Sequence, residues 1–350
     1  MRLIALLAAS LAALLPASLT AQTLVGQLAG TEVAGVDEMR SLHGGADGNL
    51  YTCGAFTGTA DLAPNLNTSA GTFLSTVASR DGFWSVYTPT FARGGTLGFV
   101  FSDDGCNAIK GDADGNAYVA GTYAGTFAFG DGTPSASSSA DNGYVAKVNP
   151  NGSLGWVRLL TGDGSVKAVG VVVDGSGNVT VAGTFTGTSV DVEGATLTGA
   201  APTAVTTFMA SYTAAGVYRW GFALGGSGTA SMTATDLELD LTSSFQTRFV
   251  LSGNFSGTVE FDPTSGQDLR SSGQSLRNGF LIRITDTGSS FGYGGGLSLA
   301  GTDDIEPLAV TSRLDGYALV GHFRGEANFD PNGPFVITTN AAGGTDGFIA

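Results

Sequence analysis

A five-fold internal repeat constrains the fold of this chain more than any other feature. A motif of glycine, any residue, an aromatic, any residue and glycine recurs at intervals of 67, 62, 70 and 68 residues. Its copies begin at Gly54, Gly121, Gly183, Gly253 and Gly321, and their aromatic residues are Phe56, Tyr123, Phe185, Phe255 and Phe323. Repeats of this length indicate stacked units of one kind, because a single unit cannot bury its apolar faces alone.

Each repeat is expected to hold about four β-strands. A β-type run such as Asn116–Ala120 leads into the motif, and turn residues such as Asp114-Gly115 precede that run in the first three copies. Such turn residues before a β-rich run indicate a hairpin. A second mark follows, whose glycine lies 22 to 28 residues after the leading glycine: Asp81-Gly82-Phe83, Asn142-Gly143-Tyr144, Asn278-Gly279-Phe280 and Asp346-Gly347-Phe348, with only Thr207-Phe208 in the third copy.

These units predict an all-β fold, a β-propeller with five blades of about four antiparallel strands. Beyond the N-terminal segment no stretch has a convincing helical period, and four short strands repeated radially form a blade. The glycines are expected where the backbone bends or approaches the next blade, with the aromatic between them filling the space between blades. A β-sandwich does not require five equal motifs, and a β-helix has a shorter period.

The repeats resemble the SBBP-type bacterial β-propeller repeats, whose copies carry a Gly-Asn strand and a later Asp-Gly-Phe strand. The corresponding segments here are Gly115–Gly121 and Asn142–Lys147, and the Phe-Asp-Pro elements at Phe261–Pro263 and Phe329–Pro331 resemble versions in secreted proteins of Gram-negative bacteria. The resemblance covers most of the chain, and the first copy is the weakest. It implies a propeller and export but supplies no reaction, because a fold does not dictate function.

Both ends of the chain carry information. Residues 1–21 have the layout of a secretory signal peptide, with Arg2 before the apolar run Leu3–Leu15, which is too short to span a membrane. Residues 22–350 then form the propeller domain, extracytoplasmic or on the cell surface. The chain stops at Ala350, one strand short of a complete unit. Either Thr23–Ala29 supplies the missing strand and closes the ring, or the chain is a fragment of a longer array.

The charge balance narrows the range of partners. Only 13% of residues are charged and the formal net charge is −15, whereas nucleic acid and anionic membranes require a basic surface. A glycan or a surface protein remains as a partner, and the oligomeric state is left open. Cys53 and Cys106 either form a disulfide, which an exported protein permits, or pack as two small apolar residues. The repeat position of Cys53 holds Ala120, Ala182, Ser252 and Val320 elsewhere, which favours packing.

Three groups of side chains are candidates for chemistry. Asp112, Asp114 and Asn116 have the alternating oxygen ligands with which calcium loops begin, but Tyr123 stands where the closing glutamate is expected, and a hairpin turn also explains them. Alternating acids in one segment would point to one side of an innermost strand and line the axis with acids of other units: Asp236, Glu238 and Asp240, with Asp37, Glu38, Asp304 and Glu306. Aromatic residues could form a sugar platform, although packing between blades is their ordinary role: Trp84, Tyr87, Trp156, Trp220 and Tyr293.

The sequence contains no recognisable catalytic constellation. His43 and His322 are its only histidines, and no nucleophile motif accompanies them. We therefore expect a non-enzymatic binding, adhesion or structural scaffold that needs no cofactor, with calcium as an option at Asp112. The alternative is a glycan-active hydrolase or lyase that uses Asp236, Glu238, Asp304 and Glu306 in an axial pocket.

Overall fold

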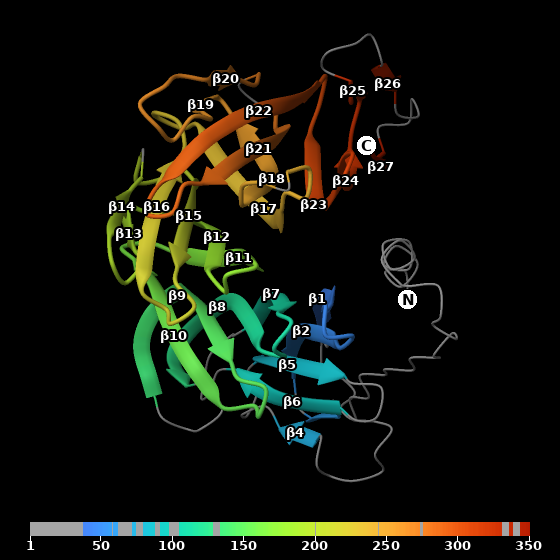
Figure 1. Cartoon of the computed structure of the whole chain (residues 1–350). Helices are drawn as coiled ribbons and strands as arrows, with labels where there is room; N and C mark the ends of the chain where they lie inside the picture. The colour runs from blue at the N-terminus through green and yellow to red at the C-terminus, as the bar shows by residue number, and fades with distance from the viewer. Residues whose placement is uncertain are drawn as a thin grey trace, which may run out of the picture.

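The computed structural model describes residues 38–57, 59–61, 72–74, 80–87, 92–97, 105–128, 134–199, 201–243, 245–273, 276–330, 336–338 and 344–350. All regular structure in these residues is β-strand, arranged as a five-bladed propeller whose blades follow one another around an axis (Figure 1). The described ranges contain no helix long and apolar enough to cross a membrane. The predicted signal peptide at residues 1–21 lies outside them, as do Thr23–Ala29 and Asp37.

Four blades share one antiparallel order, from an inner strand at the axis through a second and a third strand to an outer strand. Blade 1 consists of β1 (Glu38–Gly44), β2 (Leu50–Phe56), β5 (Asp81–Tyr87) and β6 (Ala92–Leu97). Blade 2 consists of β7 (Gly105–Gly111), β8 (Ala117–Ala128), β9 (Pro134–Val148) and β10 (Leu154–Gly162). Blade 3 consists of β11 (Val166–Val173), β12 (Val179–Phe185), β15 (Thr206–Tyr212) and β16 (Tyr218–Leu224).

Blade 4 consists of β17 (Ser231–Leu239), β18 (Arg248–Ser256), β21 (Asn278–Asp286) and β22 (Phe291–Gly301). Blade 5 has three strands in the described residues, β23 (Ile305–Arg313), β24 (Gly316–Phe323) and β27 (Asp346–Ile349). The inner strands β1, β7, β11, β17 and β23 contact one another in that order. The five-blade prediction is thereby confirmed.

The hydrophobic core lies between the blades. Four clusters of buried residues occupy the four interfaces from blade 1 to blade 5, and each draws side chains from both neighbouring sheets. Tyr51 of β2 and Tyr144 of β9, for example, lie in one cluster, and Phe208 of β15 and Val145 of β9 lie in the next. No blade has to form a core of its own, because neighbouring sheets bury each other's faces.

The leading glycine of each motif has one structural reason in all five blades. A Cβ atom at Gly253 would lie 2.0 Å from the carbonyl oxygen of Thr233 on the neighbouring inner strand and 2.7 Å from the Phe280 ring. The other four leading glycines face a carbonyl at 1.8 to 2.2 Å and an aromatic of the second mark in the same way. The predicted close approach exists, but the approaching backbone belongs to the same blade rather than to the next one.

A β-bulge in each inner strand produces this close approach. The pairing of the inner strand with the second strand shifts at one equivalent position in every blade, directly after the residue opposite the leading glycine. The extra residues are Arg40, Asn107, Val169, Thr235 and Leu308. A bulge leaves one residue unpaired and bends the strand, so it brings a carbonyl towards the facing residue.

Extra hairpins outside the predicted four strands follow the second strand of four blades, and three of them contact the outer edge of the preceding blade. They are β3 (Thr59–Asp61) with β4 (Thr72–Leu74), β13 (Ser189–Asp191) with β14 (Thr196–Thr198), β19 (Thr258–Glu260) with β20 (Leu269–Ser271), and β25 (Glu326–Asn328) with β26 (Val336–Thr338). Strand β13 pairs with β10 of the preceding blade, and β25 pairs with β22 in the same way. Between blades 3 and 4 this contact is a single bridge from Gly226 to Val259.

Candidate functional site on the propeller axis

An ion pair crosses the axis between two blades that are not neighbours. The Nζ atom of Lys110 on β7 lies 2.7 Å from the Glu238 Oε2 atom on β17. Each residue is the third after the bulge residue of its inner strand, and the same position holds His43, Val172 and Thr311 in the other blades. We call these five residues the axial ring. Burial alone would lower the pKa of Lys110, but the carboxylates of Glu238 and Asp236 outweigh it and raise the pKa.

Asp236 connects blade 4 to blade 5. Its Oδ2 atom accepts a hydrogen bond of 2.9 Å from the Val310 backbone N–H on β23, and its Oδ1 atom accepts one from Leu237 N–H. Ser41 does the same between blades 1 and 2, because its hydroxyl accepts from Ile109 N–H at 3.1 Å. Burial raises the pKa of Asp236 to about 6. This carboxyl group therefore joins two blades and is directed at backbone rather than at an open channel.

His43 contributes an imidazole that is neutral at physiological pH. Burial and the nearby charge of Lys110 lower its pKa to about 4, although Glu238 acts in the opposite direction. The axial ring thus combines an acidic side chain (Glu238), a cationic side chain (Lys110) and a neutral histidine (His43). Sequence reasoning missed Lys110 and His43, although Lys110 is one of only three lysines in the chain.

The remaining acids predicted for the axis lie elsewhere. Asp240 follows the end of β17, where its carboxylate accepts hydrogen bonds from Thr242 N–H and Oγ1 and lies 3.5 Å from Arg248 Nε. Burial acts to raise the pKa of Asp240, but the Thr242 hydrogen bonds and the Arg248 charge outweigh it and lower the pKa. Asp240 is thus part of a loop rather than of the axial ring.

Asp304 and Glu306 lie at the beginning of blade 5's inner strand. Asp304 accepts hydrogen bonds from Arg277 N–H and guanidinium groups, the shortest at 2.7 Å, and Glu306 also pairs with Arg277. Glu306 Oε2 lies 2.7 Å from His322 Nε2 on β24. Val310 lies four positions after Glu306, which is about 13 Å along a strand, so these acids do not meet Asp236 and Glu238. The structure therefore does not bring all four of these acids together.

Glu38, the equivalent acid in blade 1, is also paired. Its Oε2 atom lies 2.8 Å from Arg40 Nη2 and 3.3 Å from Arg80 Nη1. The hydrogen bond from Arg40 holds the pKa of Glu38 below its usual value, although partial burial opposes this shift. In blade 1 and in blade 5 alike, the acids at the start of the inner strand are thus paired with arginine side chains.

The predicted calcium loop uses its oxygen atoms within a hairpin turn. Asp112 Oδ1 accepts from the backbone N–H groups of Asp114 and Asn116, and Oδ2 accepts from Asn116 Nδ2 and the Tyr118 hydroxyl at 2.7 and 2.8 Å. Asp174 binds its own turn in the same pattern. Within the described ranges no group of three or more His, Cys, Asp or Glu residues could hold a metal ion. The observed geometry is that of the hairpin alternative.

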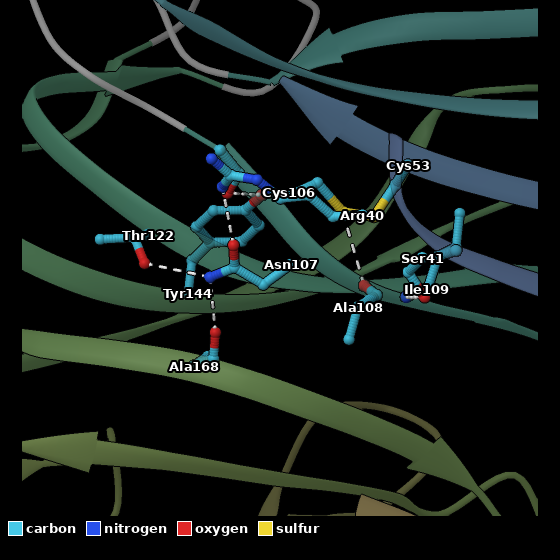
Figure 2. The surroundings of a disulfide bond; sticks show 11 residues. Arg40, Ser41, Cys53, Cys106, Asn107, Ala108, Ile109, Thr122, Tyr144 and Ala168 are labelled. Atoms are coloured by element: carbon cyan, nitrogen blue, oxygen red, sulfur yellow. Dashed lines mark hydrogen bonds between the residues drawn. A yellow bond between two sulfur atoms is a disulfide. The ribbon is translucent and has the colours of Figure 1, made fainter. Parts of the chain in front are cut away.

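A disulfide joins the first two blades. Cys53 of β2 and Cys106 of β7 are bonded with their Cα atoms 5.6 Å apart, so the disulfide alternative holds in the structure (Figure 2). The neighbouring bulge residue Asn107 accepts from Arg40 Nη1 at 2.8 Å and donates to the Ala168 carbonyl at 2.8 Å (Figure 2). Asn107 therefore bonds to blades 1 and 3 from blade 2, a role that nothing in the repeat pattern indicated.

Two of the candidate platform tryptophans are buried between blades. Trp84 and Trp220 belong to hydrophobic clusters, and Trp156 packs against another while its Nε1–H donates to the Ala214 carbonyl. Tyr293 is partly buried and hydrogen-bonded to Asp268. Tyr87, at the end of β5, is also only partly exposed. Packing between blades, the ordinary role, accounts for the three tryptophans and for Tyr293.

Exposed apolar residues instead gather at one end of the axis, over blades 4 and 5. Phe245 is 95% exposed in the loop between β17 and β18, and Leu314 is 85% exposed in the turn between β23 and β24. The β17–β18 loop contacts the end of β23, because Leu241 N–H donates to the Ser312 hydroxyl at 2.7 Å. A cleft of about 290 Å³ lies between the β17–β18 loop and the Asp174 turn of blade 3. We call Leu241, Phe245 and Leu314 the apolar face.

Comparison with known proteins adds no identification. No protein family matches this chain, and no curated protein does.

Proposed function

We propose that this chain is a secreted or cell-surface β-propeller, related to the SBBP-type repeat proteins, that binds a protein ligand and catalyses no reaction. The apolar face is the observation that carries this proposal. Phe245 and Leu314 are large apolar side chains almost fully in water, and exposed apolar residues that gather at one place mark interaction sites. Their position on connections between strands of rigid sheets is typical of binding loops.

The state of the acids predicted for the axis supports a binding function over a hydrolytic one. Glu238 is paired with Lys110 and Asp236 accepts from backbone, while Asp304 and Glu306 share Arg277. A glycosidase needs two carboxyl groups on either side of one bond, separated by about 5 to 9.5 Å and open to substrate. A protein ligand also suits Phe245, Leu241 and Leu314 better than a glycan does, because two of these residues are aliphatic.

Binding assays with the mature chain, residues 22–350, test this proposal. The chain is immobilised and exposed to panels of purified surface proteins and glycans, as wild type and as the Phe245→Ser/Leu314→Ser variant. We expect a protein ligand whose affinity falls at least roughly ten-fold in the variant, because such residues dominate binding energy. Leu269→Ser is the matched control, since Leu269 is exposed on β20 at the opposite end of blade 4.

Two results would contradict the proposal. If the double variant binds the ligand as tightly as the wild type, the apolar face does not take part in recognition. Release of reducing ends from a polysaccharide, abolished by Glu238→Gln but not by Leu269→Ser, would support the hydrolase alternative instead.

A further inference from the structure

We propose that a calcium ion binds at the outer edge of the propeller, in a cleft between blade 3 and the β19–β20 hairpin of blade 4, with Glu260, Asp262 and Thr206 as ligands. The cleft has a volume of about 250 Å³. Its walls are formed by the ends of β14 and β16, the start of β15 and the residues at the end of β19. The cleft shares no residue with the apolar face, so this inference does not rest on the proposed protein ligand.

Each of the two acids uses one carboxylate oxygen to hold its own hairpin. Glu260 Oε1 accepts from the backbone N–H groups of Asp262 and Asp268 at 2.9 and 2.6 Å. Asp262 Oδ1 accepts from Thr264 N–H at 2.8 Å. Within the described residues the second oxygen of each acid accepts no hydrogen bond, and neither acid has an ion-pair partner. The hairpin therefore fixes two carboxylates at one cleft and leaves an oxygen of each for a ligand.

The equivalent acid of the preceding hairpin has a cationic partner from the protein itself. Strand β13 contacts the blade before it through Val190, and β19 does so through Val259. Glu193 and Asp262 follow these valines by three positions each and are therefore equivalent. The Glu193 Oε2 atom lies 3.5 Å from Arg158 Nη1 on β10. Between blades 2 and 3, the outer strand thus supplies the charge that balances the acid.

The outer strand of blade 3 supplies no such charge. Arg158 lies four positions before Gly162, which pairs with Val190, and the residue four positions before the equivalent Gly226 is Phe222. Phe222 is uncharged and buried in a hydrophobic cluster. Within the described residues, the charge of the two carboxylates at this cleft is therefore not balanced. A cation from solution would take the place that the guanidinium group has at the neighbouring interface.

A buried hydroxyl group without a partner is an independent sign of a ligand at the same cleft. Thr206 lines the cleft and is 1% exposed, and its Oγ1 atom forms no hydrogen bond within the described residues. Most of the equivalent residues in other blades are longer, and Asn142, for example, accepts from Gly162 N–H of its own outer strand at 3.3 Å. Buried polar atoms are normally satisfied by protein, water or an ion. An ion in the cleft would satisfy the Thr206 oxygen.

The donor atoms favour calcium over other metals. No histidine or cysteine is among the described residues that line the cleft, so the available ligands are oxygen atoms. Calcium takes about six to eight oxygen ligands in flexible geometry, whereas magnesium demands a near-ideal octahedron and keeps several waters. Blade 5 has Asn328 in place of Glu260 in its hairpin, and Asn278 stands there in place of Thr206. We therefore expect one calcium ion per chain.

Calorimetric titration of the chain of residues 22–350 with calcium chloride tests the site. We expect one ion to bind with a Kd of roughly 0.1–1 mM, the range of extracellular calcium modules. Glu260→Gln/Asp262→Asn should weaken binding at least about ten-fold, because it removes both charges but keeps the oxygens that accept the hairpin's hydrogen bonds. Thr206→Val should weaken binding roughly three-fold, since it removes one neutral ligand. Asp191→Asn/Glu193→Gln is the matched control in the preceding hairpin and should bind like the wild type.

Other results would overturn the proposal. No binding of calcium by the wild type up to about 10 mM would exclude the site, and unchanged affinity in Glu260→Gln/Asp262→Asn would place the ion elsewhere. Tighter binding of magnesium would assign the cleft to that ion instead. Should this variant not fold, hydrogen exchange on the wild type decides. Calcium should then slow the amides of residues 258–271 at least about ten-fold and leave those of residues 189–198 unchanged, and equal exchange with and without calcium would contradict the site.

Discussion

Lys110 and Glu238 meet across the propeller axis with Nζ and Oε2 2.7 Å apart, although 128 residues separate them in the sequence. Both lie in the axial ring, at the same register position of the inner strands of blades 2 and 4. The contact therefore depends on the relative placement of three consecutive blades. It makes a sensitive probe of the ring, because either partner alone leaves a charge in a largely buried position.

Lys110→Met is expected to destabilise the protein by about 2–3 kcal/mol, somewhat below the ~3–5 kcal/mol typical of fully buried pairs, because both side chains keep some exposure. The Lys110→Met/Glu238→Leu variant should recover most of this loss, since apolar residues of similar volume often replace a buried pair at little cost. Urea denaturation followed by tryptophan fluorescence measures both. If the double variant were no more stable than Lys110→Met, an unpaired Glu238 carboxylate would not be the cause of the lost stability.

Asp236 and His43 should give opposing pH dependences of stability. The folded pKa of Asp236 is about 6 against an ordinary 3.8, so the folded protein binds this proton more tightly. Its contribution is present in full below about pH 4 and is lost as the pH rises through 6. The folded pKa of His43 is about 4 against 6.5, so its contribution is present above about pH 6.5 and is lost as the pH falls through 4.

Single variants separate the two contributions, each up to about 3 kcal/mol by linkage. Asp236→Asn should lose more stability than the wild type when the pH falls from 6.5 to 4, because only the His43 contribution remains. His43→Gln should instead lose less stability than the wild type over the same fall in pH. Thermal unfolding at half-unit pH steps provides the comparison. Parallel curves for wild type and Asp236→Asn would mean that this carboxyl group has its ordinary pKa.

The recurrent glycines and aromatics were sufficient to predict the blades from the sequence. Gly121 and Tyr144, for example, occupy equivalent places in the second and third strands of blade 2, and the strand count follows from the turns between them. These positions are readable because the contact that requires glycine is the same in every blade. The extra hairpins were missed because strands such as β13 and β19 have only three residues each, although the repeated Phe-Asp-Pro element directly follows β19 and β25.

The residues of the axial ring could not be predicted from the sequence in the same way. His43 lies 11 residues before the leading glycine of its repeat, whereas Glu238 lies 15 residues before its own. The turns between inner and second strands differ in length, so counting from the glycine does not align these residues; only the pairing across the bulge does. Asp304 was expected beside Asp236 for this reason, and it lies instead at the start of its strand.

Removal of the disulfide should weaken the protein without preventing its folding. The equivalent interfaces hold Ala120 with Ala168 and Ala182 with Ala234, so two alanines suit this contact. Because the link closes a loop of 53 residues, Cys53→Ala/Cys106→Ala is expected to lose about 3–4 kcal/mol. Guanidinium denaturation with and without dithiothreitol checks this. The reductant should lower the unfolding midpoint of the wild type to that of the variant and leave the midpoint of the variant unchanged.

Gly253→Ala tests the contact that defines the repeat. The added methyl group would lie 2.0 Å from the Thr233 carbonyl oxygen, which is backbone of a paired strand and cannot move without disturbing the bulge. We expect a loss of about 3 kcal/mol, at the upper end of the usual cost of overpacking. Gly175→Ala is the matched control, because no atom lies within 4 Å of its Cβ position. Equal midpoints of urea unfolding for the two variants would contradict the steric origin of the motif, since the control differs only in the space around the new methyl group.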